Sequence, residues 1–143
     1  MTVQKITTES QLEEAFMIRK AVFVEEQQVP LADEFDQFDY LDAKCNHILI
    51  YHENKPVGTG RIRIVEGGGK LERICLLENY RSLGLGKVII KALEDIAKEQ
   101  NIKQVKLHGQ THAEGFYQKL GYETSSSVFM EDGIPHVLMT KTF

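Results

Sequence analysis

The chain has 143 residues, of which 42% are hydrophobic, and this suits one globular domain, residues 1–143, with a single core. The net charge is −4 and Lys and Arg do not form runs, which argues against a nucleic-acid or membrane-surface partner. Residues 1–6 are too polar for a signal peptide, and no stretch approaches the ~20 apolar residues of a membrane span, so we expect a cytoplasmic protein.

The first third of the chain predicts a strand, a helix and an ordered loop. Residues 3–6 form the strand, and Thr8 is placed to cap a helix that runs through Val24. Residues 29–43 carry five acidic side chains among three aromatic ones. Because the aromatic rings need burial, we expect an ordered loop or broken helix there and not a disordered segment.

Strands dominate the next part of the sequence. Residues 46–52 and 56–65 predict two strands joined by a turn at 53–55, and three glycines at 67–69 predict a tight connection to a strand at 70–77. Strict alternation along this last strand places three residues on one face and two on the other. The first set is Glu72, Ile74 and Leu76, and the second is Arg73 and Cys75.

The segment Arg81-Ser82-Leu83-Gly84-Leu85-Gly86-Lys87 separates that strand from an amphipathic helix. The glycines let the backbone approach a ligand, and the unpaired N–H groups of the first helical turn favour an anion. The helix is predicted to face the core through residues at helical spacing. These are Leu85, Ile89, Leu93 and Ile96.

Two familiar phosphate loops do not match this segment. A P-loop requires glycine five positions before Gly86 and Ser or Thr after Lys87, but Arg81 and Val88 stand there. A dinucleotide-binding loop requires a third small residue where the chain has Ile89.

The last third of the chain predicts a strand at 104–109, a helix at 113–120, and strands near 128–131 and 136–142. Strand and helix alternate in the middle of the chain, while hairpins lie at the ends. We therefore expect an α/β (α+β) protein with a mixed, largely antiparallel sheet of about six or seven strands and helices on both faces.

The cysteines and histidines do not predict a disulfide or a metal site. Cys45 and Cys75 lie in strand-like apolar surroundings, which favours two buried, reduced thiols. His108 and His112 are four residues apart, as in a helical zinc site, but Gly109 and the strand pattern before it do not provide a helix.

Four segments in the same order resemble the GNAT superfamily of N-acetyltransferases. The pattern Arg-x-x-Gly-x-Gly at 81–86 is similar to the family's acyl-CoA pyrophosphate loop, and Phe116-Tyr117-Gln118-Lys119-Leu120-Gly121-Tyr122 to its last helix end. Residues 57–63 and 71–76 resemble the two strands before that loop. Within the superfamily, residues 22–27, 71–75 and 133–136 look most like the small bacterial YjcF and ElaA type proteins.

The resemblance implies an enzyme that transfers an acetyl group from acetyl-CoA, as cosubstrate, to a primary amine by direct attack. The acceptor is a small molecule or a peptide, and a homodimer is compatible with the sequence. The implied cofactor-binding residues lie on the strand, the glycine loop and the last helix. They are Ile74, Cys75, Leu76, Arg81, Ser82, Leu83, Gly84, Leu85, Gly86, Lys87, Gln110, where many relatives carry Asn, and Phe116.

Two residues are candidates for proton transfer. Glu72 occupies a position that in the family often carries the base or its water, but it could equally pair with Arg61 or Arg63 across the hairpin. Tyr117 matches the tyrosine that returns a proton to the leaving thiolate, and its alternative role is core packing beside Phe116.

The acceptor site is the least determined part of the sequence. The resemblance places Glu26, Asp39, His108 and His136 near the acceptor cleft, where an acidic rim would favour a cationic amine. Each acidic residue could instead be solvated, and His136 could simply be a turn residue. A non-catalytic acyl-CoA-binding sensor or an interaction domain is the alternative function, and neither would need Glu72 or Tyr117.

Overall fold

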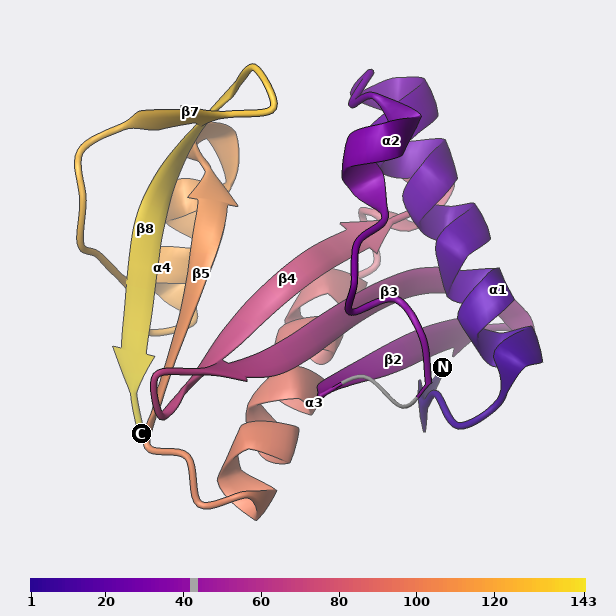
Figure 1. Cartoon of the computed structure of the whole chain (residues 1–143), viewed down its shortest axis with the longest axis horizontal. Coiled ribbons are helices and arrows are strands. Elements are labelled where there is room, and N and C mark those ends of the chain that lie inside the picture. Colours follow the sequence, from indigo (N-terminus) through magenta and orange to yellow (C-terminus); the bar gives the residue numbers. More distant parts are fainter. Residues whose placement is uncertain (42–43) are drawn as a thin grey trace.

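The computed structural model describes residues 1–41 and 44–143, which form one mixed sheet with helices on both faces (Figure 1). Neighbouring strands are antiparallel except β4 and β5, which are parallel. The order is β1-β2-β3-β4-β5-β8-β6, and β7 also pairs with β8. The strands are β1 (Thr2–Lys5), β2 (Cys45–His52), β3 (Lys55–Val65), β4 (Gly68–Leu76), β5 (Gln104–Gln110), β6 (Glu123–Thr124), β7 (Phe129–Glu131) and β8 (Ile134–Thr142).

The helices cover the sheet from two sides. α1 packs on one face of β2, β3 and β4, while α3 and α4 lie on the other face (Figure 1). No helix in the described ranges is long and apolar enough to cross a membrane. The helices are α1 (Glu9–Arg19), the π-helical η1 (Lys20–Glu26), α2 (Leu31–Glu34), the 3₁₀ turn η2 (Glu78–Tyr80), α3 (Leu85–Glu99), the 3₁₀ turn η3 (Thr111–Ala113) and α4 (Glu114–Lys119).

The architecture confirms the predicted mixed, largely antiparallel sheet with helices on both faces. The described part of the sheet has eight strands, and not six or seven, because the two-residue strand β6 adds to the edge. Asp42 and Ala43, at the end of the predicted 29–43 loop, lie outside the described residues. The rest of that loop contains the short helix α2.

The predicted helix from Thr8 to Val24 changes its type midway. Thr8 caps α1 as expected, because its side chain accepts from the Gln11 backbone and Gln11 bonds back to the cap. After Arg19 the chain continues as π-helix to Glu26. Such wider turns inside helices are frequent at functional sites, and here they bring Glu26 and the following residue to a cavity.

The turn between β3 and β4 is tighter than predicted. Val65 pairs with Gly68, so only Glu66 and Gly67 form the turn, both with positive φ. Two residues with positive φ match the twist of an antiparallel hairpin. Gly68 and Gly69 therefore belong to β4 and not to the connection.

The main core lies between the sheet and α3. Its four predicted core residues, Leu85, Ile89, Leu93 and Ile96, are all buried. Two glycines of β3 let this helix approach closely. An added Cβ at Gly58 would lie 2.6 Å from a Leu76 methyl, and one at Gly60 would lie 3.0 Å from methyls of Ile89 and Leu93.

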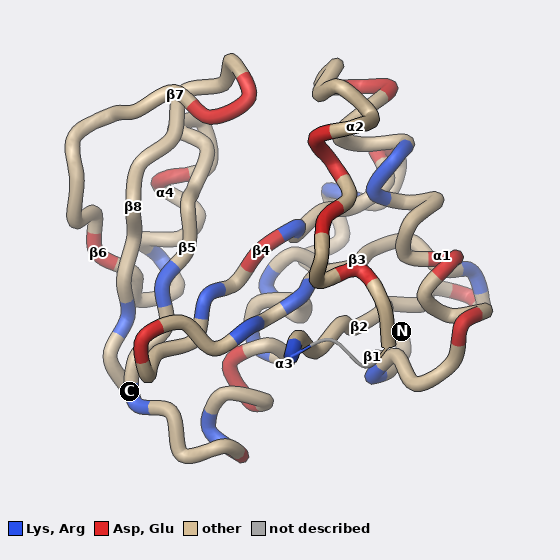
Figure 2. The backbone as a smooth tube through the Cα atoms, in the orientation of Figure 1, with Lys and Arg blue, Asp and Glu red and all other residues tan. Residues whose placement is uncertain are grey.

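On the other face, buried charges join α1 to the sheet. Arg19 and Arg61 are each 1% exposed. The acidic segment after α2 crosses β3 on this face of the sheet (Figure 2). Arg19 binds Glu34 and Asp39, and Arg61 binds Asp36 and Asp39. These ion pairs fix the 34–39 segment on the sheet.

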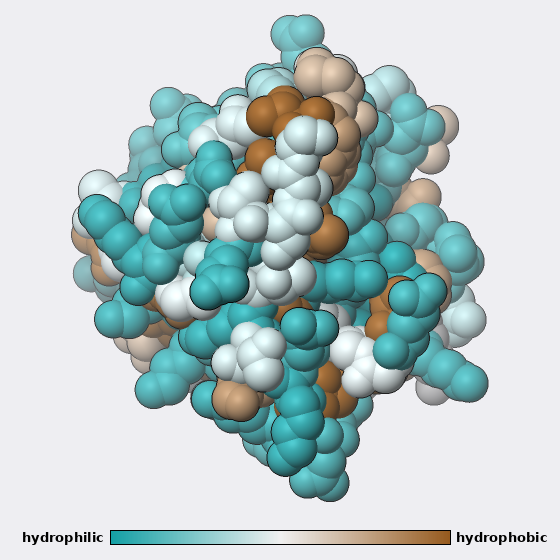
Figure 3. Space-filling model, turned by 90° about the vertical axis from the view of Figure 1, so that its left-hand side faces the viewer, coloured by the Kyte–Doolittle hydropathy of each residue, from teal (hydrophilic) through white to brown (hydrophobic). Residues whose placement is uncertain are grey.

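The side of the molecule toward β6, β7 and β8 is mostly hydrophilic, with small separate hydrophobic patches (Figure 3). Val128 and Met130, in and beside β7, are among the exposed hydrophobic residues at 59% and 64%. Isolated apolar side chains of this kind are ordinary on a protein surface.

Candidate active site

The sheet opens into a fork between its two parallel strands. β4 and β5 pair only where Gly69 to Leu71 face Val105 to Leu107, and beyond these residues the strands diverge (Figure 1). The open end of the fork contains a cavity of about 380 Å³. In this size range a cavity can hold the reacting part of a small ligand.

A β-bulge shapes the β4 side of the fork. Thr59 pairs with Cys75 and Arg61 with Glu72, so Gly60 faces two residues of β4. Arg73, one of these two, has a φ of 55°, in the left-handed region. A bulge of this kind adds a residue to one strand and changes the direction of its side chains.

The bulge corrects the predicted alternation along β4. Glu72 was expected to share a face with Ile74 and Leu76. Instead, Glu72 lies with Arg61 on the α1 side, whereas Ile74 and Leu76 pack with the α3 core. The extra residue in the strand reverses the phase of a two-residue period, so Cys75 also faces α1.

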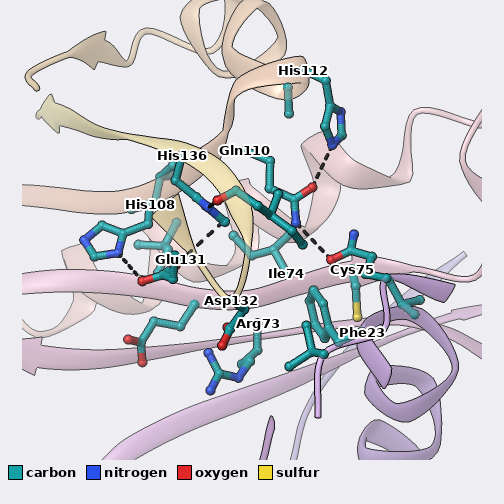
Figure 4. A pocket seen from close by; sticks show the side chains of 18 of the residues that line it. Phe23, Arg73, Ile74, Cys75, His108, Gln110, His112, Glu131, Asp132 and His136 are labelled. Atoms are coloured by element: carbon teal, nitrogen blue, oxygen red, sulfur yellow. Dashed lines mark hydrogen bonds and ion pairs between the residues drawn. The ribbon is translucent and has the colours of Figure 1, made fainter. Parts of the chain in front are cut away.

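Residues from eight of the described helices and strands line the cavity, and most of the predicted site residues are among them (Figure 4). The predicted residues that line it are Glu26, Glu72, Ile74, Cys75, Leu76, Arg81, His108, Gln110, Tyr117 and His136.

The glycine loop leads from the cavity to the N-terminus of α3. Gly84 precedes the helix with a φ of 74°, and no side chain caps the first turn. An N-terminus of this kind can bind an anion through its backbone N–H groups. An added Cβ at Gly86 would lie 3.2 Å from the exposed ring of Phe116, so this glycine and the α4 phenylalanine are neighbours.

The remaining loop residues do not line the cavity in the described structure. Ser82, Leu83 and Lys87 are exposed, and the side chain of Leu85 is buried in the core. Leu85 can therefore act on a ligand only through its backbone.

Two polar contacts connect η1 to the strands that border the cavity. The Arg81 guanidinium donates to both carboxylate oxygens of Glu26 at 2.6 and 2.8 Å, and its Nε donates to the Leu76 carbonyl. The Gln110 side chain donates to Gln27 at 3.0 Å. In both contacts the partner on the π-helical side, Glu26 or Gln27, lies at the C-terminal end of η1.

The carboxylate of Glu72 is surrounded by cations. Its oxygens lie 2.8 Å from Arg63 Nε, 3.1 Å from Arg61 Nη2 and 3.1 Å from Lys70 Nζ. Burial opposes the charge, but these partners outweigh it and hold the pKa of Glu72 at about 2. The cross-strand ion pair predicted as the alternative role is therefore present, and so weak a base is disfavoured for taking a proton from an amine.

Tyr117 projects from α4 into the cavity. Its ring fits where Gly109 has no side chain, since an added Cβ there would lie 3.2 Å from the ring. It also packs beside Phe116 and Tyr122. Burial raises the pKa of Tyr117 to about 12, so the phenol keeps its proton at neutral pH.

The predicted acceptor residues separate into two groups. Glu26, His108 and His136 line the cavity, as predicted, but Asp39 does not. The Asp39 side chain is 4% exposed and bonds to Arg19 and Arg61, because the 34–39 segment turns its carboxylates onto the buried arginines. This prediction was wrong, since the sequence shows the charge of Asp39 but not its partners.

Several residues that line the cavity were not predicted from the sequence. The most important is Glu131, which the β7–β8 hairpin brings next to His108 and His136. A turn signal, Asp132-Gly133, follows it directly in the sequence. Others are Phe23 and Gln27, and Arg73 at the bulge. His112, which bonds to Gln110, and Asp132 also line the cavity.

Comparison with known proteins identifies the family. The model of the acetyltransferase (GNAT) domain matches residues 7–143. The chain belongs to the GNAT family of acetyltransferases.

Bacterial relatives and a solved structure agree with this assignment. The chain is 64% identical to the uncharacterized protein YyaT of Bacillus subtilis (strain 168), over 99% of this chain and 95% of the relative. It is 46% identical to the uncharacterized N-acetyltransferase YjcF of the same organism, over 93% and 94%. The crystal structure of Escherichia coli ElaA superposes with a TM-score of 0.86 at 30% identity, covering 99% of each chain. The resemblance to YjcF and ElaA type proteins is thereby confirmed.

Proposed function

We propose that this GNAT protein transfers the acetyl group of acetyl-CoA to a primary amine of a small molecule or peptide, by direct attack of the amine on the thioester. The observation that carries the proposal is the cavity in the β4–β5 fork, which extends from Arg81 to Tyr117. One end of it adjoins the glycine loop, and the other adjoins two histidines and a carboxylate. An enzyme with two substrates needs such a continuous space between its cofactor and acceptor sites.

The N-terminus of α3 suits the pyrophosphate of CoA. Gly84, Gly86 and the uncapped first turn offer backbone N–H groups and the positive end of the helix dipole. Arg81 adds a guanidinium at the border of the cavity. A structural neighbour, an aminoglycoside 6′-N-acetyltransferase complexed with coenzyme A, shares the fold at a TM-score of 0.79 and 15% identity.

The reacting thioester is proposed to lie beside β4. Backbone N–H groups beyond the bulge, among them that of Leu76, would hold the carbonyl oxygen while it gains negative charge. Tyr117 would donate its proton to the sulfur as the C–S bond breaks, because its raised pKa keeps the phenol protonated. Acetyl-CoA as the donor also fits a cytoplasmic protein with free Cys45 and Cys75.

Thermal unfolding with and without CoA tests the cofactor. We expect CoA at ~100 times its dissociation constant to stabilise the fold by about 2.7 kcal/mol. Gly86→Val should abolish this shift, because a branched side chain on the first helical turn blocks approach to the N–H groups. Asp95→Val, at an exposed position further along α3, is the matched control and should keep it.

Release of free thiol from acetyl-CoA tests the transfer. Spermidine, kanamycin, L-lysine and a peptide with a free N-terminus cover the main classes of amine acceptor. Thiol release that depends on one of these amines supports the proposal. CoA binding without transfer to any amine would instead support the acyl-CoA sensor, and an unchanged melting temperature in millimolar CoA would refute the cofactor assignment.

A further inference from the structure

The tautomer of His136 is fixed by the backbone. Its Nδ1 lies 2.7 Å from the carbonyl oxygen of Ile134, two residues earlier in β8. A carbonyl oxygen can only accept a hydrogen bond, so Nδ1 carries the hydrogen. In the neutral ring the lone pair is then on Nε2, which is the nitrogen that can take a proton.

In the described part of the chain, one carboxylate lies within 4.0 Å of this nitrogen. Glu131 Oε2 is 3.6 Å from His136 Nε2, which is longer than a hydrogen bond, so the lone pair remains available (Figure 4). The other oxygen, Oε1, lies 2.9 Å from Nδ1 of His108 and accepts its hydrogen. His108 therefore orients the carboxylate, as second partners do in histidine–carboxylate sites.

Packing holds His108, Glu131 and His136 in place. The Phe129 ring stacks on His136 at a centroid distance of 6.1 Å and meets His108 edge-on at 5.0 Å. Phe129 and His136 are directly paired in the β7–β8 hairpin, as are Glu131 and Ile134. His136 is only 7% exposed, so its ring has little freedom to turn.

Other charged groups in the cavity are largely neutralised by one another. Glu26 pairs with Arg81, Glu34 with Arg73, and Glu72 with Lys70. Asp132 has no Lys or Arg partner among residues 1–41 and 44–143 and lies at the hairpin turn, and His112 bonds to Gln110. Glu131 is thus the carboxylate closest to the free nitrogen and the natural site for a cationic group.

We propose that His136 Nε2 takes the proton from the ammonium group of the acceptor, while Glu131 holds first the ammonium and then the imidazolium. This assignment rests on the proposed function, and it replaces Glu72 as the base. His108 acts as a positioning residue through Glu131. The ligand class at this end of the cavity is therefore a primary ammonium.

The proton and electron balance is complete. The ammonium N–H bond breaks, its electron pair stays on nitrogen, and the proton moves to Nε2. The free amine forms the C–N bond to the acetyl carbon, and the C–S bond breaks with its electron pair on sulfur. Tyr117 protonates the sulfur and recovers a proton from the new amide nitrogen, while His136 releases its proton to solvent.

Enzyme kinetics of His136→Asn test whether His136 is the base that takes the proton from the acceptor. The Asn amide can still donate to the Ile134 carbonyl but has no counterpart of Nε2. We expect kcat to fall by about 10² to 10⁴-fold with the best amine of the panel, with partial rescue by added imidazole. The CoA-induced shift in melting temperature should be unchanged. His52→Asn, outside the cavity, is the matched control and should keep full turnover.

Glu131→Gln separates positioning from simple stability. It keeps the shape of the side chain but loses the charge, so KM for the amine should rise and kcat should fall by about 10-fold or more. A structural role alone would change the melting temperature and leave the KM unchanged. Wild-type turnover of folded His136→Asn would overturn the proposal.

Nitrogen-15 NMR of labelled histidines in the CoA-bound protein shows which ring nitrogen of His136 carries the hydrogen, and it needs no acceptor. We expect Nδ1 of His136 to carry hydrogen throughout an acid titration, and Nε2 to be the nitrogen that gains a proton. A neutral ring with its hydrogen on Nε2 would overturn the proposal even if CoA binds. Failure of the wild-type protein to bind CoA would instead refute the proposed function.

Discussion

Tyr117, the proposed proton donor, shows how neighbouring residues set the environment of a single side chain. Gly109 leaves space for its ring, and the surrounding aromatic residues bury it. Burial disfavours the phenolate, so the pKa rises to about 12. The phenol therefore keeps its proton at neutral pH and can donate a hydrogen bond to a sulfur on which negative charge develops.

Tyr117→Phe keeps the ring and removes only this proton. Turnover is expected to fall by about 10 to 10³-fold, because water must then protonate the sulfur. The melting temperature and the CoA-induced shift should change little. Thiol-release kinetics and thermal unfolding of the same preparation provide the check, and full activity of the variant would show that Tyr117 only packs.

At the scale of elements, the site depends on how closely α3 approaches β3 and on how far β4 leaves β5. The glycines of β3 permit the close approach of α3, and the bulge at Arg73 lies where β4 diverges from β5. Together they hold the N-terminus of α3 beside the end of β4. The spatial relation between the N-terminus of α3 and the fork is thus a property of packing and does not depend on any one side chain.

Gly58→Ala tests this packing. The new methyl would lie 2.6 Å from Leu76 Cδ2 of β4 and 3.1 Å from Ile89 Cδ1 of α3, so the Leu76 side chain must move and the contact with α3 becomes tighter. Overpacking of a core typically costs about 1–3 kcal/mol, and we expect a lower melting temperature together with weaker CoA binding. Gly115→Ala is the control: no atom lies within 4 Å of its added Cβ, and Ala favours the α4 helix. A variant as stable as the wild type would show that the side chains around Gly58 accommodate the methyl and that this glycine is not required for the packing.

Local patterns in the sequence predicted most elements correctly. The Thr8 cap, the core face of α3 and the strand periods all depend on neighbours within one turn or one strand. The bulge at Arg73 was not predictable in this way, because a two-residue period assumes that no residue is inserted. The switch to π-helix after Arg19 was missed for the same reason.

The site was predicted where it depends on a motif and missed where it depends on long-range contacts. The glycine loop and Tyr117 were found from short segments. Glu131 reaches His108 only through the pairing of β7, β8 and β5, and Asp39 reaches Arg61 across 22 residues. A sequence shows which charges are present, whereas the fold decides which of them meet.

For the whole molecule, buried ion pairs join the acidic segment to α1 and the sheet, beside an apolar cluster in which Ala15 and Ile18 of α1 pack on the sheet. Arg19 and Arg61 are almost fully buried, so each needs its carboxylates to remain charged. The arginines lower the pKa of Asp36 and Asp39, whereas burial raises that of Glu34. The free energy of unfolding must consequently depend on pH. Asp36 and Asp39, with lowered pKa, lose their stabilising contribution as the pH falls, whereas the raised pKa of Glu34 makes its contribution less favourable as the pH rises.

Glu72→Gln tests how a carboxylate that lines the cavity contributes to the pH dependence of stability. The folded-state pKa of Glu72 is about 2, below its ordinary 4.5, so the folded protein favours the charged form. The resulting stability, on the order of 3 kcal/mol, is fully present above pH 4.5 and is lost as the pH falls through about 2. Urea unfolding should therefore show a large loss in Glu72→Gln at pH 7 and a smaller one at pH 3.

Glu13→Gln makes the same chemical change at an exposed position of α1 and should leave stability unchanged at both pH values. Turnover of Glu72→Gln should stay close to that of the wild type under conditions where the variant is folded, because His136 and not Glu72 is assigned to the proton. A variant with unchanged unfolding but a 10²-fold lower kcat would reverse this assignment and make Glu72 the base. The two measurements on one variant thus separate a carboxylate that holds the sheet together from one that takes part in the reaction.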